Sequence, residues 1–164
     1  MESLTLHWGG PIHFYELREE WHTPQARATY CEKLENHGIY QDWGIYMVVG
    51  GQNILYIGQT YDQTFYDRLT QHMNDETWWR CARRACSGRE PFFKCAYLKE
   101  AYSRRRISDI ESFLIFVIQP RCNSTGASYD GHTFKLKNTG NFWPLNSTYH
   151  TEDYRAFPEW GLRQ

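Results

Sequence analysis

Hydrophobic and polar positions alternate in strand-like and helix-like patterns between residues 44 and 118. The run GIYMVV at 44–49 is rich in β-branched and aromatic residues, and a second apolar run at 54–57 follows the turn residues 50–53. Two such runs joined by Gly and Asn residues are typical of a β-hairpin. The segment PFFKCAYL at 91–98 predicts a third strand.

A helix is predicted directly after the hairpin. Thr60 with Gln63 three residues later resembles a capping box, which would open the helix. Phe65, Leu69 and Met73 then recur at four-residue steps and form one apolar face.

A second helix is predicted to begin at Ser108, with Glu111 again three residues later, and to end before Pro120. Its apolar positions recur at three- and four-residue steps, so we expect one face to be buried. These positions are Ile107, Ile110, Leu114, Val117 and Ile118.

The two flanks carry weaker patterns. Residues 12–36 contain helix-compatible stretches with a new start at Thr23 and Pro24, and the tail 124–164 indicates turns and short strands. The order hairpin, helix, strand, helix predicts an α/β (α+β) fold with a small three-stranded antiparallel or mixed central sheet flanked by helices. A length of 164 residues favours one domain over 1–164, with a core at about 43–124. We interpret 1–42 and 125–164 as elaborations of that same domain.

Composition narrows the class of protein. Aromatic residues make up 17% of the chain, which argues against disorder. The mean hydropathy is −0.72 and the longest apolar stretch is 113–118, so a membrane span is excluded. The first residues lack the basic segment and apolar core of a signal peptide, so we expect a cytoplasmic protein.

The chain has five cysteines, an odd number, and no sign of a secretory context. We therefore expect them to be reduced thiols. Cys81, Cys86 and His72 suggest a zinc site only weakly, because their spacing matches no common zinc-ligand pattern.

The net charge of −1 hides a basic block at residues 80–106. This block has nine basic residues against two acidic ones, a charge of +7, and it also contains aromatic residues. The simpler interpretation is a solvated face over an aromatic core. The alternative is a surface that contacts phosphates. The arginines that we expect to bind nucleic acid are Arg80, Arg83, Arg84, Arg89, Arg104, Arg105 and Arg106.

Polar residues stand at particular places in these predicted elements. The first hairpin strand begins Gly44-Ile45-Tyr46 and the second carries Tyr56-Ile57-Gly58; the later polar positions are Arg68, His72, Glu111 and Asn123. This order resembles the GIY-YIG nuclease family, whose later motif elements are Arg, His, Glu and Asn. The resemblance covers residues 43–124, half of the chain, and includes both tripeptides unaltered.

The chain contains a second copy of the first tripeptide, Gly38-Ile39-Tyr40. Ten residues separate Tyr46 from Tyr56, which suits two short strands and a tight turn, whereas Tyr40 would place Asp42 and Trp43 inside a strand. We therefore take Tyr46 as the motif residue and Tyr40 as a decoy.

The residue types suit phosphodiester hydrolysis. The guanidinium of Arg68 can fork onto two phosphate oxygens, and His72, four residues on, projects from the same helical face. The carboxylate of Glu111 can hold one Mg²⁺ or Mn²⁺, which would neutralise developing charge.

The resemblance implies that one of the two tyrosines takes a proton from water. A phenol with a pKa near 10 is a poor base, so we expect Arg68 and the metal to lower that pKa. We favour Tyr46 as the base and Tyr56 as a positioner of phosphate or water, but the sequence does not separate them. The resemblance also implies that Asn123 organises the site through hydrogen bonds. Taken singly, each of these residues has an ordinary structural interpretation, such as a strand aromatic or a helix cap.

We therefore expect a divalent-metal-dependent endonuclease acting on double-stranded DNA. The chain carries no recognisable appended DNA-binding motif, and in this it is similar to small restriction endonucleases of the family. Cutting both strands with one site per chain would favour a homodimer. The alternatives are a phage, mobile-element or repair nuclease of the same family, or a nucleic-acid-binding module without catalysis. A purely structural interaction protein is argued against by the basic block.

Overall fold

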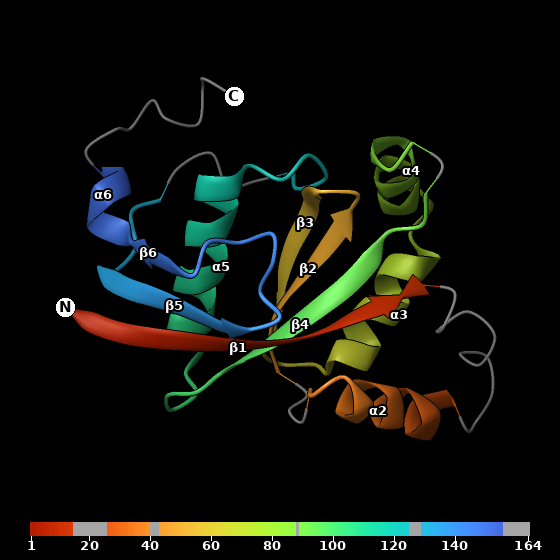
Figure 1. Ribbon diagram of the computed structural model, residues 1–164, viewed down its shortest axis with the longest axis horizontal. Coiled ribbons are helices and arrows are strands. Elements are labelled where there is room, and N and C mark those ends of the chain that lie inside the picture. Colours follow the sequence, from red (N-terminus) through yellow and green to blue (C-terminus); the bar gives the residue numbers. More distant parts are fainter. Residues whose placement is uncertain (15–25, 40–42, 88, 125–128, 156–164) are drawn as a thin grey trace.

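The computed structural model describes residues 1–14, 26–39, 43–87, 89–124 and 129–155. In these residues one mixed sheet of six strands has the order β3-β2-β4-β1-β5-β6 and is accompanied by five helices (Figure 1). The strands are β1 (Glu2–His13), β2 (Gly44–Gly50), β3 (Asn53–Thr60), β4 (Phe92–Leu98), β5 (Phe134–Gly140) and β6 (Thr148–His150). The helices are α2 (Ala26–Asn36), α3 (Phe65–Asn74), α4 (Glu76–Ala85), α5 (Arg104–Ile118) and α6 (Thr151–Arg155).

The prediction of a three-stranded sheet is wrong, because the flanks contribute strands. β1 lies inside the sheet, antiparallel to β4 on one side and parallel to β5 on the other. Its residues Leu4, Leu6 and Trp8 are buried and alternate with less buried neighbours. This two-residue period is present in the sequence, but for this flank only helix-compatible stretches were predicted and no strand. The short strands expected in the tail are confirmed by β5 and β6.

The predicted hairpin is confirmed, and its two motif glycines have steric reasons. Gly44 lies against β4, where an added Cβ would meet the Ala96 carbonyl oxygen at 1.8 Å. Gly58 lies opposite Tyr46 in the register, where a Cβ would stand 2.3 Å from the Tyr46 hydroxyl. Any larger residue at either position would displace a strand or the tyrosine.

Both predicted helix starts are displaced. Thr60 ends β3 and accepts a hydrogen bond from the Gly44 backbone, and α3 begins after a capping box formed by Thr64 and Asp67. α5 begins at Arg104, directly after the cap residue Ser103 and four residues before the predicted start at Ser108. Glu111 therefore lies in the middle of α5 and has no capping role. The predicted end before Pro120 is confirmed.

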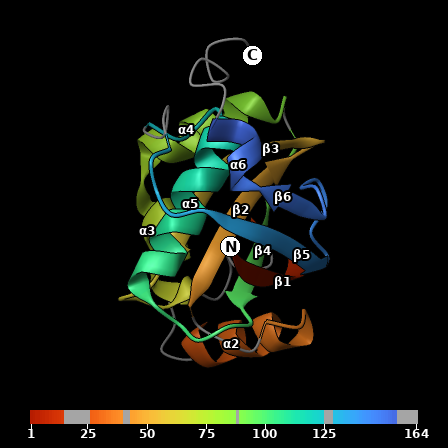
Figure 2. The same ribbon diagram turned by 90° about the vertical axis from the view of Figure 1, so that its left-hand side faces the viewer.

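Two hydrophobic cores cover the two faces of the sheet. One core joins α5 to residues such as Ile45 and Met47 of β2, whereas the other joins α2, α3 and α4 to Tyr46 and Val48. Figure 1 shows α5 on one side of the β2–β3 hairpin with α3 and α4 on the other, and Figure 2 shows the same arrangement after a quarter turn. Alternate residues of β2 thus face different helices, as the period of a strand requires.

The expectation of reduced thiols is wrong for one pair. Cys81 of α4 forms a disulfide with Cys122, which follows α5, while Cys86 and Cys95 are buried free thiols. Because Cys81 is bonded to Cys122, it is not free to join the zinc site considered with Cys86 and His72. Among the described residues, no helix combines the length and apolar character that crossing a membrane requires.

Candidate active site

The centre of the site is the hydroxyl of Tyr46, a fully buried residue of β2. Its oxygen lies 2.5 Å from Nε2 of His72 and accepts a hydrogen bond from Nε of Arg68 at 3.3 Å. Arg68 and His72 are one turn apart on α3, so the same helical face presents both groups to the tyrosine. The capping box at Thr64 sets where this helix begins and therefore which residues face β2.

The side chains of Tyr46 and His72 are both neutral in the free protein, chiefly because they are buried. Burial lowers the pKa of His72 to about 4, with a smaller contribution from the charge of Arg68. The Nε2 atom of His72 is therefore unprotonated at neutral pH and can accept the Tyr46 proton. Burial and the neighbouring Tyr56 raise the pKa of Tyr46 well above its ordinary value of 10, although Arg68 opposes the rise. The expected lowering by Arg68 is present, but desolvation outweighs it.

Tyr56 and Trp78 enclose His72 from the other sides. The His72 ring lies 4.9 Å from the Tyr56 ring and 4.6 Å from the Trp78 ring, measured between centroids. The tyrosine rings of 46 and 56 stack at 5.9 Å, which confirms that both point to the same face of the hairpin. This aromatic enclosure is the physical cause of the desolvation of His72.

A cleft of about 530 Å³ opens beside this cluster. Tyr56, Arg68 and His72 line it, whereas Tyr46 lies buried beneath them. The other lining residues are Gln71, Asp75, Thr77, Trp78, Cys81, Cys122 and Ser124. The indole Nε1 of Trp78 is buried without a hydrogen-bond partner.

Glu111 approaches from α5, on the opposite face of the sheet. The side chain and backbone of Gln59 in β3 both hydrogen-bond its carboxylate. Burial raises the pKa of Glu111 to about 7, and Arg68 and Gln59 only partly offset this rise.

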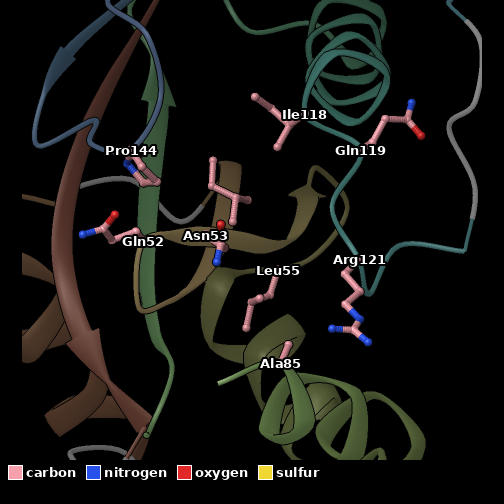
Figure 3. A pocket seen from close by; sticks show the side chains of 9 residues that line it. Gln52, Asn53, Leu55, Ala85, Ile118, Gln119, Arg121 and Pro144 are labelled. Atoms are coloured by element: carbon pink, nitrogen blue, oxygen red, sulfur yellow. The ribbon is translucent and has the colours of Figure 1, made fainter. Parts of the chain in front are cut away.

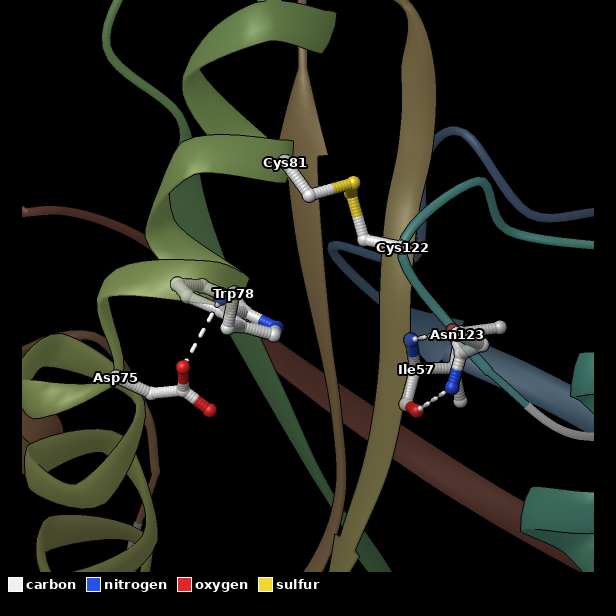
Figure 4. The surroundings of a disulfide bond; sticks show 6 residues. All are labelled: Ile57, Asp75, Trp78, Cys81, Cys122 and Asn123. Atoms are coloured by element: carbon white, nitrogen blue, oxygen red, sulfur yellow. Dashed lines mark hydrogen bonds between the residues drawn. A yellow bond between two sulfur atoms is a disulfide. The ribbon is translucent and has the colours of Figure 1, made fainter.

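Asn123 is held at the outer edge of β3 (Figure 4). Its side chain accepts from the Ile57 backbone N–H at 3.0 Å and donates to the Ile57 carbonyl at 2.8 Å. The preceding residue, Cys122, donates its backbone N–H to the Leu55 carbonyl at 2.8 Å. Asn123 thus completes the hydrogen bonding of an edge strand, and the disulfide with Cys81 ties the same segment to α4.

The six predicted site residues therefore meet around the free edge of β3. Tyr46, Arg68 and His72 are in direct contact, Tyr56 packs on them, and Glu111 and Asn123 reach the same strand from the α5 side. The sequence interpretation did not select Gln59 or Trp78. Gln59 follows the second tripeptide directly, and that adjacency was the available signal. For Trp78 the sequence offers none, because its contact with His72 depends on how α4 packs.

The residues present fit a divalent ion of the kind predicted. Glu111 supplies one carboxylate, and the Oε1 atom of Gln59 is buried beside it without a hydrogen-bond partner. Carboxylate and amide oxygens are ligands that Mg²⁺ accepts, and this ion keeps several waters. No group of three or more His, Cys, Asp or Glu side chains that could hold a metal occurs among the described residues, so a closed cage is not the form of site they offer.

The basic block is divided between two places. Arg80, Arg83, Arg84 and Arg89 are exposed on and after α4, and Arg83 lies over the ring of Trp79, which stacks on the cleft-lining Trp78. Arg104, Arg105 and Arg106 begin α5. Arg106 is partly buried and pairs with Glu2, whereas Arg104 is exposed and pairs with Asp62.

A second cavity, of about 450 Å³, lies at the turn of the hairpin (Figure 3). Arg121, Gln119 and Gln52 are among its lining residues. None of the six predicted site residues borders it.

A buried tyrosine bonded to histidine and arginine, with a carboxylate at the same sheet edge, suits the chemistry of a phosphodiester-hydrolysing nuclease domain. The sequence model of the protein family described as the GIY-YIG catalytic domain matches residues 42–137. The chain therefore belongs to the GIY-YIG family. The match confirms the resemblance over 43–124 and extends it into β5. Searches of curated proteins and of solved structures found no match.

Proposed function

We propose that the protein is a cytoplasmic, divalent-metal-dependent endonuclease that cuts double-stranded DNA in a restriction-type role. The observation that supports it best is the Tyr46–His72 hydrogen bond of 2.5 Å beside Arg68 and the cleft. A binding module without catalysis would have no need for a buried phenol, a neutral imidazole and a guanidinium in one network.

In this proposal Tyr46 is the proton acceptor for the attacking water. Its own proton passes to Nε2 of His72, which is neutral at physiological pH and lies at hydrogen-bond distance. Tyr56, which lines the cleft, positions the water or the phosphate. The protein must overcome the raised pKa of Tyr46, and the onward transfer to His72 together with the charge of Arg68 serves that purpose.

Arg68 binds the phosphate and stabilises the charge that develops on its oxygens. Its Nε donates to the Tyr46 hydroxyl, while its terminal Nη1 donates to Gln71 on the exposed side. A charged group fixed by such a bond needs little reorganisation during the reaction.

Glu111 would hold a single Mg²⁺ or Mn²⁺, which supplies charge neutralisation at the leaving oxygen when bound. Gln59 fixes the orientation of the carboxylate through its side chain and backbone. Asn123 fixes the edge of β3 between Tyr56 and Gly58, so its role is positional.

The double-stranded substrate and the role are supported by less specific features. The exposed arginines of α4 and of the start of α5 would provide salt-dependent attraction to phosphates. A homodimer would allow both strands to be cut. The Cys81–Cys122 disulfide does not support the cytoplasmic part of the proposal, because thiols in the cytoplasm are kept reduced.

Plasmid digestion with Mg²⁺ or Mn²⁺, followed by sequencing of the ends, tests the proposal. Discrete ends are expected for a restriction-type enzyme. Scattered ends or nicks would favour a phage, mobile-element or repair nuclease of the same family. No products with any divalent metal would instead favour the binding module.

A further inference from the structure

Two exposed aromatic residues, Trp43 and Tyr61, lie at the open end of the β2–β3 hairpin, opposite its turn. Trp43 and Tyr61 are 47% and 36% exposed, and both are among the large exposed hydrophobic residues of the described chain. They flank the paired residues Gly44 and Thr60, so the two rings come from adjoining strand ends. We name Trp43, Tyr61 and Arg104 the hairpin-end cluster.

Each ring in the hairpin-end cluster is held by a neighbour. The Tyr102 ring packs edge-on against Trp43 at 5.8 Å, and its hydroxyl donates to the Trp43 carbonyl. The Arg104 guanidinium lies 5.4 Å from the Tyr61 ring centroid and pairs with Asp62. Rings that are already ordered lose little conformational entropy when a ligand stacks on them.

The cluster lies on the same edge as the proposed active site. Tyr61 follows Gln59 by two residues, and Arg104 precedes Glu111 by seven residues on α5. Seven residues are two turns, or about 10 Å, and they place both side chains on one helical face. At about 3.4 Å per nucleotide in a B-form strand, this separation is roughly three nucleotides.

We propose that the hairpin-end cluster is a stacking site for one base of the substrate strand, displaced from its pair in the bound double-stranded DNA about three nucleotides from the cut. Aromatic rings beside an exposed cation are the chemistry that binds nucleobases and their phosphates. The Arg104–Asp62 pair is about two-thirds exposed on both sides, so a phosphate can displace the carboxylate at little cost. A contact between two copies is disfavoured, because it would bring their Arg104 and Arg105 side chains together. The inference rests on the proposed nuclease function.

The test uses a short oligothymidine with one central 2-aminopurine, in the absence of divalent metal. Binding to the wild type should change the 2-aminopurine fluorescence as the base stacks. Trp43→Ala and Tyr61→Ala should each remove this change and weaken binding roughly fivefold to 100-fold, whereas Tyr61→Phe, which keeps the ring, should retain both. Trp143→Ala is the matched control, since Trp143 is 48% exposed but packs near Lys94.

Unchanged fluorescence and affinity in Trp43→Ala and Tyr61→Ala would overturn the stacking site. Loss of a dimer in sedimentation of these two variants, with binding unaltered, would identify a contact between copies and would also overturn it. Because the probe is not cut, the result is independent of plasmid digestion. Stacking without cleavage would remove the nuclease proposal and the stated distance to a cut but keep the base-stacking site, whereas cleavage without stacking would remove this inference alone.

Discussion

The Tyr46 hydroxyl is the residue-scale feature on which the proposed chemistry depends. Tyr46→Phe removes one oxygen atom, its bond to His72 and its bond from Arg68. We expect cleavage to fall by about 10²–10⁴-fold, as for loss of a general base. Single-turnover cleavage of plasmid DNA is the measurement.

Tyr40→Phe is the matched control for that variant, because Tyr40 ends the decoy tripeptide and lies outside the described residues. It should leave cleavage unchanged. Loss of activity in Tyr40→Phe with retention of activity in Tyr46→Phe would show that Tyr40, and not Tyr46, is the motif residue. Gly38 lies in the turn after α2 and Ile39 follows it outside any strand, which already supports the choice of Tyr46.

Glu111 links pH, metal and stability at a single carboxylate. Its pKa of about 7 in the folded protein exceeds its ordinary value of 4.5, so folding favours the protonated form. The stability contributed by the neutral group is fully present below about pH 4.5 and is lost as the pH rises through 7. Cleavage that requires the ionised form should in turn decline below about pH 7.

Glu111→Gln should therefore abolish divalent-dependent cleavage and raise the free energy of unfolding at pH 8 by about 1–3 kcal/mol. At pH 4 the two proteins should unfold at nearly the same urea concentration, and this is the internal control. Added Mg²⁺ at pH 8 should stabilise the wild type and not the variant. Stabilisation by Mg²⁺ in both proteins would mean that Glu111 is not the metal ligand.

At the scale of elements, the outer edge of β3 connects the two halves of the site. Its backbone groups are paired with the Cys122 backbone, the Asn123 side chain and the Glu111 carboxylate. An edge strand normally leaves such groups to solvent. Here they fix the segment after α5 and the acidic residue of α5 relative to the tyrosines.

The disulfide joins α4 to the segment that carries Asn123. Replacing Cys81 and Cys122 with Ser should lower the free energy of unfolding by about 2–4 kcal/mol, because the bond closes a long loop of the unfolded chain. Urea unfolding with and without a reductant measures this loss. The Cys31→Ser variant is the control, since Cys31 lies outside the Cys81–Cys122 pair, and reductant should shift the wild type but not the double variant. Equal stability of wild type and double variant would contradict a stabilising disulfide.

At the scale of the whole molecule, the N-terminal flank is part of the sheet. β1 pairs with both β4 and β5, and its Leu6 and Trp8 lie in the core beneath α5. Removal of residues 1–42 would leave β4 without a partner on that side and would detach β5 from the sheet.

A chain reduced to residues 43–164 should therefore fail to fold cooperatively. Loss of the sigmoidal urea transition, followed by circular dichroism, is the expected result. The comparison protein is a chain shortened after Arg155, which keeps all six strands and should unfold like the full chain. A cooperative, active 43–164 fragment would contradict the structural role of β1.

The sequence by itself determined the family, the hairpin, the third strand and the identity of six residues around the site. These features depend on local patterns, namely strand period, turn glycines and ordered polar positions along the chain. The same local reasoning placed both helix starts a few residues away, because Thr60 and Ser108 have good capping chemistry but are already used by β3 and α5.

Only the tertiary structure decided which residues surround that hairpin. β1 pairs with strands about 90 and 130 residues away along the chain, and a pattern of alternating side chains does not name its partners. The contacts of Trp78 with His72, Gln59 with Glu111 and Cys81 with Cys122 likewise depend on packing. So does the pKa of Tyr46: the sequence predicts the charge of Arg68 beside it, but the opposing desolvation arises only when the chain closes over the ring.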